Sequence, residues 1–219
     1  LIKGTPSGRR RFLDMEISQT SATYYHQLMQ YNRLLQQRNA VLKEYRGKNT
    51  IPLEEWDLQL ADMASFIVKK RLESLKKINL LIDLMNRKLT GGLENLTIGY
   101  EQPYMDNGSL EYTKEGFYER IKAALPQDRH RLSTSVGPHR DDLRFFSDAM
   151  DLKKFGSQGQ QRTAVLSLKL SELEFIKSEV GEYPVLLLDD VLSELDESRR
   201  TNLLQFIHKR IQTFITTTD

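Results

Sequence analysis

The stretch from Pro184 to Asp196, PVLLLDDVLSELD, constrains the fold more than any other part of the chain. Its apolar run, Val185 to Leu188, shows no polar alternation, which is typical of a parallel strand covered on both faces. Asp189 and Asp190 follow at the carboxyl end of this strand, where open α/β sheets bind their ligands. A carboxylate there can hold Mg²⁺ while its neighbour orients an attacking water. The alternative interpretation is a core strand followed by an acidic, solvated turn.

A glycine-containing turn upstream, FGSQGQQRT from Phe155 to Thr163, opens a helix that we expect to run to about Ser178. Ser157 can cap this helix, and Gly159 permits close approach of a ligand to the backbone. Because the first amides of a helix and its dipole favour an anion, the turn suits a phosphate. Read alone, Ser-x-Gly before a helix is also a common structural N-terminus.

Composition limits the class of protein without identifying it. The 219 residues suffice for one large domain or two small ones, and 39% apolar content allows a substantial core. There is no cysteine, which excludes disulfides and thiolate metal sites, and no apolar run approaches the roughly 20 residues that cross a membrane. We therefore expect a soluble intracellular protein. The start at Leu1, without an initiator methionine, favours a fragment.

Charge is distributed unevenly along the chain. Residues 1–93 carry 16 Lys and Arg against 9 Asp and Glu, a balance of +7, whereas the remaining residues carry 16 against 21, a balance of −5. A basic half predicts a polyanionic partner such as DNA, although a lysine-rich solvated surface gives the same pattern. The candidate phosphate contacts repeat at roughly helical spacing: Lys69, Lys70, Arg71, Lys76, Lys77, Arg87 and Lys88.

Two long helical patterns occupy the basic half, one over residues 23–45 and one from about Pro52 to the Gly91-Gly92 stop. Joined by a short loop, they predict an antiparallel helical hairpin. Beyond residue 92 we expect a strand over 96–100, a helix over 113–124, and strands over 132–136 and 142–146. His139 and Arg140 lie between the last two; a turn histidine beside two aspartates is more often structural than catalytic.

The order of these features matters more than any one of them. ATP-binding-cassette ATPases have the same order of elements. In them a helix start suited to phosphate is followed by an apolar strand that ends in two acids, and then by a segment like Ser193-Glu194-Leu195-Asp196. GSQGQQRT resembles their signature motif, the acidic strand resembles Walker B, and SELD resembles their D-loop. Within that superfamily the chain most closely resembles the RecF family of bacterial DNA-gap repair proteins, related to SMC heads. The matching segments span essentially the whole chain: RRRFLD from Arg9, QRN from Gln37, GPHRDDL from Gly137, the three motifs above, and FITTT from Phe214.

The resemblance implies an α/β fold. Residues 94–219 would form the C-terminal half of an ABC/SMC-type ATPase head, a P-loop NTPase-like sheet with helices. Residues 1–93 would form a helical hairpin lobe, where SMC proteins carry a long coiled coil.

The resemblance also implies roles for single residues. Asp189 would coordinate Mg²⁺, and Asp190 would polarise the attacking water where most relatives place a glutamate. ATP held by a second subunit would contact this chain at Ser157, Gln158, Gly159, Gln160, Asp196 and Thr218. The chain departs from the superfamily because Gly156 and Gln158 replace the usual leucine and glycine of the signature. In addition, Thr218 stands where many transporters have a switch histidine.

The phosphate-binding P-loop, GxxxxGK[ST], is absent from these residues. The sole Gly-Lys pair, Gly47-Lys48, lacks the upstream glycine because position 42 is leucine. In the family this Walker A element lies in an N-terminal segment. We therefore expect the intact protein to be a weak ATPase, and this chain alone to bind ATP weakly or not at all.

The function implied by the resemblance is ATP-gated DNA binding in the bacterial cytoplasm. An ATP-dependent homodimer would engage duplex DNA at a single-strand gap and, with RecR- and RecO-type mediators, help load recombinase in repair, replication and the SOS response. A non-catalytic DNA-binding or protein-docking module of another SMC-like protein is the alternative.

Overall fold

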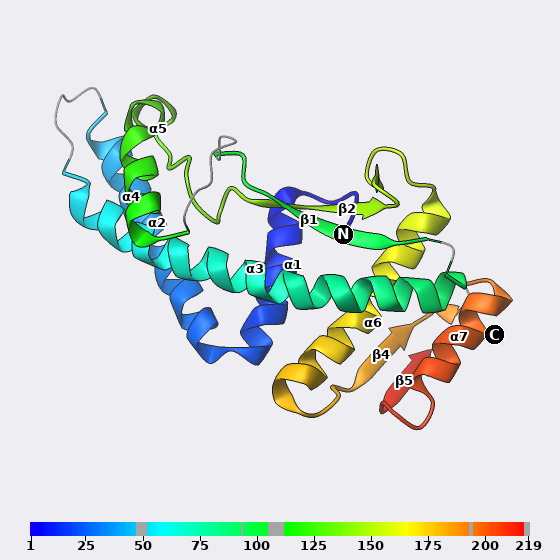
Figure 1. The fold of residues 1–219 in the computed structure, drawn as a ribbon. Coiled ribbons are helices and arrows are strands. Elements are labelled where there is room, and N and C mark those ends of the chain that lie inside the picture. Colours follow the sequence, from blue (N-terminus) through cyan, green and yellow to red (C-terminus); the bar gives the residue numbers. More distant parts are fainter. Residues whose placement is uncertain (47–51, 93, 105–111, 193–194, 217–219) are drawn as a thin grey trace. The chain divides into compact units, whose positions relative to one another are not determined.

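The computed structural model describes residues 1–46, 52–92, 94–104, 112–192 and 195–216 (Figure 1). The chain divides into two compact units. Unit 1 comprises residues 1–3, 75–99 and 144–219, and unit 2 comprises residues 4–74 and 100–143. The boundary expected at residue 93 differs from this division. Helix α3 (Glu54–Thr90) contributes residues to both units, and residues 100–143 belong with the N-terminal helices.

Unit 2 is mainly helical. It contains α1 (Pro6–Thr20), α2 (Ala22–Glu44), the first part of α3, α4 (Lys114–Ala123) and α5 (Leu125–Arg131). Helices α1 and α2 follow each other directly in the chain (Figure 1). The side chain of Ser21, between them, caps α2 by accepting a hydrogen bond from the amide of Tyr24. The two long predicted helices are confirmed as α2 and α3, with ends within two residues of the prediction, whereas α1 was not predicted. No described helix, including the 37-residue α3, is long and apolar enough to cross a membrane.

The segment 132–136, predicted as a strand, is an irregular loop. Side-chain oxygens replace the backbone partners that a sheet would supply. Asn39 Oδ1 accepts from the amide and hydroxyl of Thr134, both at 2.8 Å, and Asp128 Oδ1 accepts from the amide of Ser135 at 2.8 Å. These acceptors lie on α2 and α5, so their contribution is not visible in the local sequence pattern.

Two small sheets are described. The first has the order β1 (Leu96–Glu101), β2 (Asp142–Ser147) and β3 (Met150–Asp151), and β2 pairs with β3 in antiparallel fashion. The second, in unit 1, pairs β4 (Leu186–Asp189) with β5 (Thr213–Thr216) in parallel, with Leu186 opposite Thr213. Helix α7 (Glu197–Ile207) lies between these two strands in the sequence. The parallel strand predicted from the apolar run is therefore confirmed.

The core of unit 1 covers one face of β4. Leu186 and Leu188 belong to a buried cluster with side chains from α3, α6 (Gln158–Val180) and α7. On the other face Val185 is 52% exposed and Leu187 is 72% exposed, and Phe214 of β5 is 60% exposed. Burial on both faces, expected from the unbroken apolar run, is thus wrong within the described part of the chain. This second face is mostly exposed in the described part of the chain.

Candidate functional site

The start of α6 is built as a capping box. The Ser157 hydroxyl accepts from the amide of Gln160 at 3.2 Å, while the amide of Ser157 donates to the side-chain Oε1 of Gln160 at 3.0 Å. The side-chain nitrogen of Gln160 reaches Glu94 Oε1 at 3.2 Å. Cap formation by Ser157 confirms the sequence prediction. The oxygen and the nitrogen of the Gln160 side-chain amide thus both hold the turn in place.

The loop before this helix is held equally firmly. A Cβ on Gly156 would lie 2.7 Å from the carbonyl oxygen of Leu152, so only glycine fits there. The side-chain amide of Gln161 donates to the carbonyl oxygens of Leu152 and Gly156 at 2.7 and 3.0 Å. The turn therefore has a defined shape before any ligand is present.

The first turn of α6 presents backbone donors to solvent. The amide of Gln160 is capped and that of Gln161 donates to the carbonyl of Ser157 at 3.0 Å. Within the described chain, the amides of Gln158 and Gly159 are left without an intrahelical acceptor, as is usual at a helix start. Both residues are exposed, and a Cβ on Gly159 would meet nothing nearer than the Ser157 hydroxyl at 4.0 Å. This surface is chemically suited to an anion.

Asp189 ends β4 and is exposed at its carboxyl end. Its Oδ1 accepts a hydrogen bond from the hydroxyl of Thr216, at the end of β5, at 2.5 Å. The parallel register sets Asp189 opposite Thr216 and so brings the two side chains together. Thr216 was not among the predicted site residues, because its proximity depends on the register of two strands 27 residues apart.

Asp190 follows with a left-handed backbone, at φ 50°. Its amide donates to the carbonyl and the hydroxyl of Thr216, both at 3.2 Å. Aspartate and asparagine tolerate this conformation better than most side chains. The chain thus turns sharply where the sheet ends, and Asp190 is only partly buried.

Asp196 caps α7. Its carboxylate accepts from the amide of Arg199 at 2.9 Å and pairs with the Arg199 guanidinium at 2.8 Å. The hydrogen bond from the Arg199 amide, helped by the guanidinium charge, lowers the pKa of Asp196 below its usual value. Thr218 and Ser193 lie outside the described residues.

The oxygen atoms around Asp189 would supply only part of the ligands that Mg²⁺ needs. Among the described residues no three His, Asp, Glu or Cys side chains gather into a metal cage. One exposed carboxylate, Asp189, beside a hydroxyl at a sheet edge is nonetheless the kind of site that Mg²⁺ uses when phosphates and waters supply its other ligands.

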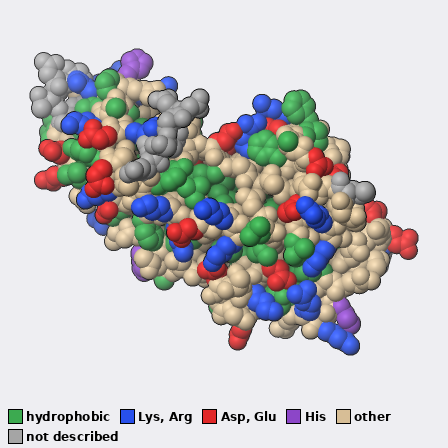
Figure 2. Space-filling view, in the orientation of Figure 1, with side chains coloured by type: hydrophobic (Ala, Val, Ile, Leu, Met, Phe, Trp, Pro, Cys, Tyr) green, Lys and Arg blue, Asp and Glu red, His purple; other side chains and the backbone are tan. Residues whose placement is uncertain are grey.

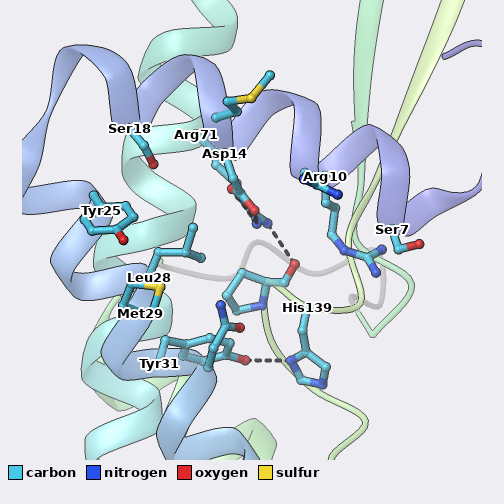
Figure 3. A pocket seen from close by; sticks show the side chains of 14 residues that line it. Ser7, Arg10, Asp14, Ser18, Tyr25, Leu28, Met29, Tyr31, Arg71 and His139 are labelled. Atoms are coloured by element: carbon cyan, nitrogen blue, oxygen red, sulfur yellow. Dashed lines mark hydrogen bonds and ion pairs between the residues drawn. The ribbon is translucent and has the colours of Figure 1, made fainter.

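Arg71 is not available to contact DNA, contrary to the prediction. Its side chain is 2% exposed, and its Nε and Nη2 each donate to Asp14 at 2.9 Å. Its Nη1 donates to the carbonyl oxygen of Pro138 at 2.8 Å (Figure 3). This buried pair lies beside a groove of about 700 Å³, with Arg10 at one end and Tyr25 at the other.

The lysines of the candidate set remain accessible. Lys69, Lys76 and Lys77 are exposed on α3 and Lys70 is half-buried. Lys70 and Lys77 already pair with acids, with Glu73 at 3.6 Å and Glu179 at 2.5 Å. Figure 2 shows basic and acidic side chains interspersed over the visible face, with no uninterrupted basic stripe. DNA contact by these lysines stays a prediction.

His139 is a structural residue. Its Nε2 faces the carbonyl oxygen of Thr134 at 3.0 Å, and its Nδ1 faces the Tyr31 hydroxyl at 2.6 Å (Figure 3). Because a carbonyl can only accept, Nε2 carries the proton and Nδ1 accepts from Tyr31. Burial, with nearby arginines, lowers the pKa of His139 to about 4. The imidazole is therefore neutral and fully engaged at neutral pH.

Comparison with known proteins identifies the chain's relatives. No protein-family model matches. Curated proteins named "DNA replication and repair protein RecF" from Alkaliphilus oremlandii, Halothermothrix orenii and Halalkalibacterium halodurans are 50%, 48% and 47% identical over 220, 225 and 223 residues. Each alignment includes all of this chain, which spans 60% of each relative's length.

Solved structures agree with the sequence comparison. The recombination mediator protein RecF bound to ATP in the RecFOR pathway is 38% identical, with a TM-score of 0.89 over all of this chain and 59% of the other. A second structure, of the recombination mediator protein RecF with ATPrS in the RecFOR pathway, is 37% identical with a TM-score of 0.88. The α/β fold is that of the corresponding part of these RecF structures. The chain therefore belongs to the RecF family.

Proposed function

We propose that the full-length form, a chain of its relatives' length that carries these 219 residues, is an ATP-gated DNA-binding protein of recombinational repair. One observation carries the proposal. The start of α6 is a rigid turn with exposed backbone donors, in a chain whose solved relatives are described with ATP or ATPrS. Preorganised donors stabilise a phosphate without the cost of rearrangement.

Within this proposal the α6 start of one subunit contacts the γ-phosphate of ATP held by a second subunit. Ser157 shapes the turn, the amides of Gln158 and Gly159 donate, and Asp196 and Thr218 lie at the same subunit interface. ATP favours the dimer because it contacts both subunits only when they are together.

Asp189 and Asp190 divide the remaining roles. Asp189 would supply one oxygen ligand to Mg²⁺, whose positive charge would offset that of the phosphates. Asp190 would hold the attacking water by accepting its hydrogen bond. Its side chain is one methylene shorter than a glutamate, which is consistent with slow turnover and a protein that uses ATP as a switch.

The dimer would bind duplex DNA next to a single-strand gap and cooperate with RecR- and RecO-type mediators in loading recombinase. Lys69 and Lys76 are two exposed candidates for phosphate contact on α3. They lie seven residues apart, two turns along one helix, and so project in nearly the same direction.

Mass in solution, with and without ATP and Mg²⁺, tests the proposal on the full-length form. Ser157→Arg should abolish ATP-driven dimerisation, because an arginine would fill the turn and remove the cap. Ser178→Arg adds the same charge to an exposed site on the last turns of α6 and should dimerise normally. A wild-type mass that does not respond to ATP would refute the proposal and favour a docking module.

Gly159→Ala tests whether a ligand approaches the start of α6, without disturbing the fold. The structure leaves room for the added methyl, and alanine favours a helix, so stability should be unchanged or slightly higher. The methyl nevertheless projects from the first turn, so ATP-driven dimerisation should weaken. Equal dimerisation by this variant and wild type would show that the start of α6 does not contact ATP at the subunit interface.

Asp190→Asn tests hydrolysis. Asparagine also tolerates a left-handed backbone, so the turn should survive while the carboxylate charge is lost. We expect ATP turnover to fall while ATP-driven dimerisation persists. Unchanged turnover would show that Asp190 is not the catalytic carboxylate.

A further inference from the structure

A second hollow of unit 2 brings three arginines together. It measures about 390 Å³, lies along α4 and α5, and is separate from the groove beside Arg71. Arg120, Arg131 and Arg140 all line it, although they come from α4, α5 and the loop before β2. We refer to it as the arginine hollow.

Neutral partners hold these guanidinium groups in position. Arg120 Nη1 donates to the carbonyl oxygen of Tyr104 at 2.7 Å. Arg140 donates through Nε and Nη2 to the carbonyl oxygen of Thr134 at 3.0 and 2.6 Å. Carbonyl oxygens orient a guanidinium without cancelling its charge, and each group has five N–H donors. Donors therefore remain for a ligand.

No carboxylate is among the described residues that line the hollow. The nearest acid along α5, Asp128, is completely buried beneath it. One oxygen of Asp128 accepts from Arg38 at 2.7 Å and the other from the amide of Ser135 at 2.8 Å. This carboxylate is directed to the interior of unit 2. Among the described residues, the arginine hollow thus combines three cationic groups with no carboxylate in its lining.

We propose that the arginine hollow binds the phosphodiester backbone of a nucleic-acid strand; the inference rests on the proposed function, that the protein acts on DNA. Planar guanidinium groups match phosphate oxygens in pairs, which favours phosphate over a diffuse counterion. Between the arginines lie small apolar side chains, Ala123, Ala124 and Val136, against which a sugar ring can rest. The hollow is larger than a single phosphate needs, so a strand with successive phosphates fits it better than free phosphate does.

Two substitutions test the site with little risk to the fold. Arg131 is exposed, and its guanidinium has the side chain of Gln127 as its neighbour at 3.1 Å, so Arg131→Ala removes one cation cleanly. Ala123 is exposed at the end of α4, so Ala123→Glu places a carboxylate in the hollow without disturbing a buried contact. Arg33→Ala, at an exposed position of α2, is the matched control for charge.

The readout is fluorescence anisotropy of labelled single-stranded and duplex oligonucleotides over a series of salt concentrations, with the full-length form. Arg131→Ala should weaken binding several-fold and reduce the slope of log Kd against log salt by about 0.7–0.9, the value for one phosphate contact. Ala123→Glu should weaken binding further. Arg33→Ala should behave as wild type.

Calorimetry with inorganic phosphate distinguishes a site for free phosphate from a site for the phosphates of a nucleic acid. Loss of phosphate binding in Arg131→Ala with unchanged DNA affinity would make the hollow a free-anion site and overturn the proposal. Equal DNA affinity for Arg131→Ala, Ala123→Glu and Arg33→Ala would also overturn it, and an acidic protein partner would then be the next candidate. DNA binding that depends on Arg131 in a protein that ATP fails to dimerise would support this inference while refuting the ATP-gated function.

Discussion

Replacing His139 by glutamine should remove an acid-sensitive element of unit 2 without removing its hydrogen bonds. In the structure Nδ1 of His139 accepts from the Tyr31 hydroxyl and Nε2–H donates to the carbonyl of Thr134. A glutamine amide has an acceptor oxygen and a donor NH₂ group, so it can serve both partners, but it does not titrate. The variant therefore isolates the effect of protonation.

The size of the expected change in the free energy of unfolding follows from the pKa of His139. Burial lowers the pKa of His139 from 6.5 to about 4, so the unfolded chain takes up this proton well before the folded chain does. The stabilisation of the folded state is complete above the unfolded pKa and is lost as the pH falls from 6.5 to about 4. A difference of this size corresponds to about 3 kcal/mol, with a slope of about 1.4 kcal/mol per pH unit.

Urea unfolding measures this directly, because Trp56, the sole tryptophan, lies in unit 2 and reports its unfolding. The free energy of unfolding of His139→Gln minus that of wild type should rise by about 3 kcal/mol between about pH 7 and about pH 4. Burial also raises the pKa of Asp141 to about 6, which has the opposite effect, but this carboxylate is present in both proteins and cancels in the difference. A difference that does not change with pH would refute the reasoning.

Three further substitutions test the packing of each unit. Arg38→Met leaves two buried carboxylates without their guanidinium and should lower the free energy of unfolding by about 3–5 kcal/mol, measured by Trp56 fluorescence in urea. Gly137→Ala places a Cβ 2.3 Å from the Tyr31 hydroxyl at φ 129° and should cost about 1–3 kcal/mol in the same assay. Ser157→Ala removes the cap of α6 and should cost about 1 kcal/mol, seen as faster amide exchange in its first turns.

Matched controls sharpen these tests. Arg33→Met, at an exposed site of α2, should change stability by much less than Arg38→Met. Gly91→Ala also has a positive φ, 69°, but meets no atom within 4 Å, so it lacks the steric clash of Gly137→Ala; because Gly91 lies in unit 1, its cost is measured by circular dichroism in urea rather than by Trp56. Equal losses of stability for Arg38→Met and Arg33→Met would show that burial of Arg38 does not govern its effect. Equal losses for Gly137→Ala and Gly91→Ala would show the same for the contact with Tyr31.

Local patterns predicted the elements that carry the proposed nucleotide site. The apolar run before Asp189 and the capping signal at Ser157 each act within a few residues, and both are confirmed. Helix α1 was missed because Arg9 and Glu16 are buried beside Phe12, Leu13 and Ile17, so the face that packs inward is only partly apolar. Periodicity of apolar residues cannot identify such a helix.

Long-range partners account for the other differences. Arg71 looked like one cation in a Lys-Lys-Arg run, and its burial depends on Asp14, 57 residues earlier. The loop over 132–136 depends on Asn39, 95 residues from Thr134. In both cases a polar side chain from a distant helix overrides the local preference, and a single sequence carries no signal of that pairing.

The exposed face of β4 and β5 has a practical consequence for mass measurements on these 219 residues by themselves. Leu187 and Phe214 form exposed apolar surface, which can drive association without nucleotide. Such association is entropic near room temperature and strengthens on warming, unlike a complex that requires ATP. Mass should therefore be recorded at two temperatures before nucleotide is added. A dimer of the 219-residue chain that grows on warming in the absence of ATP is explained by this face and not by the start of α6.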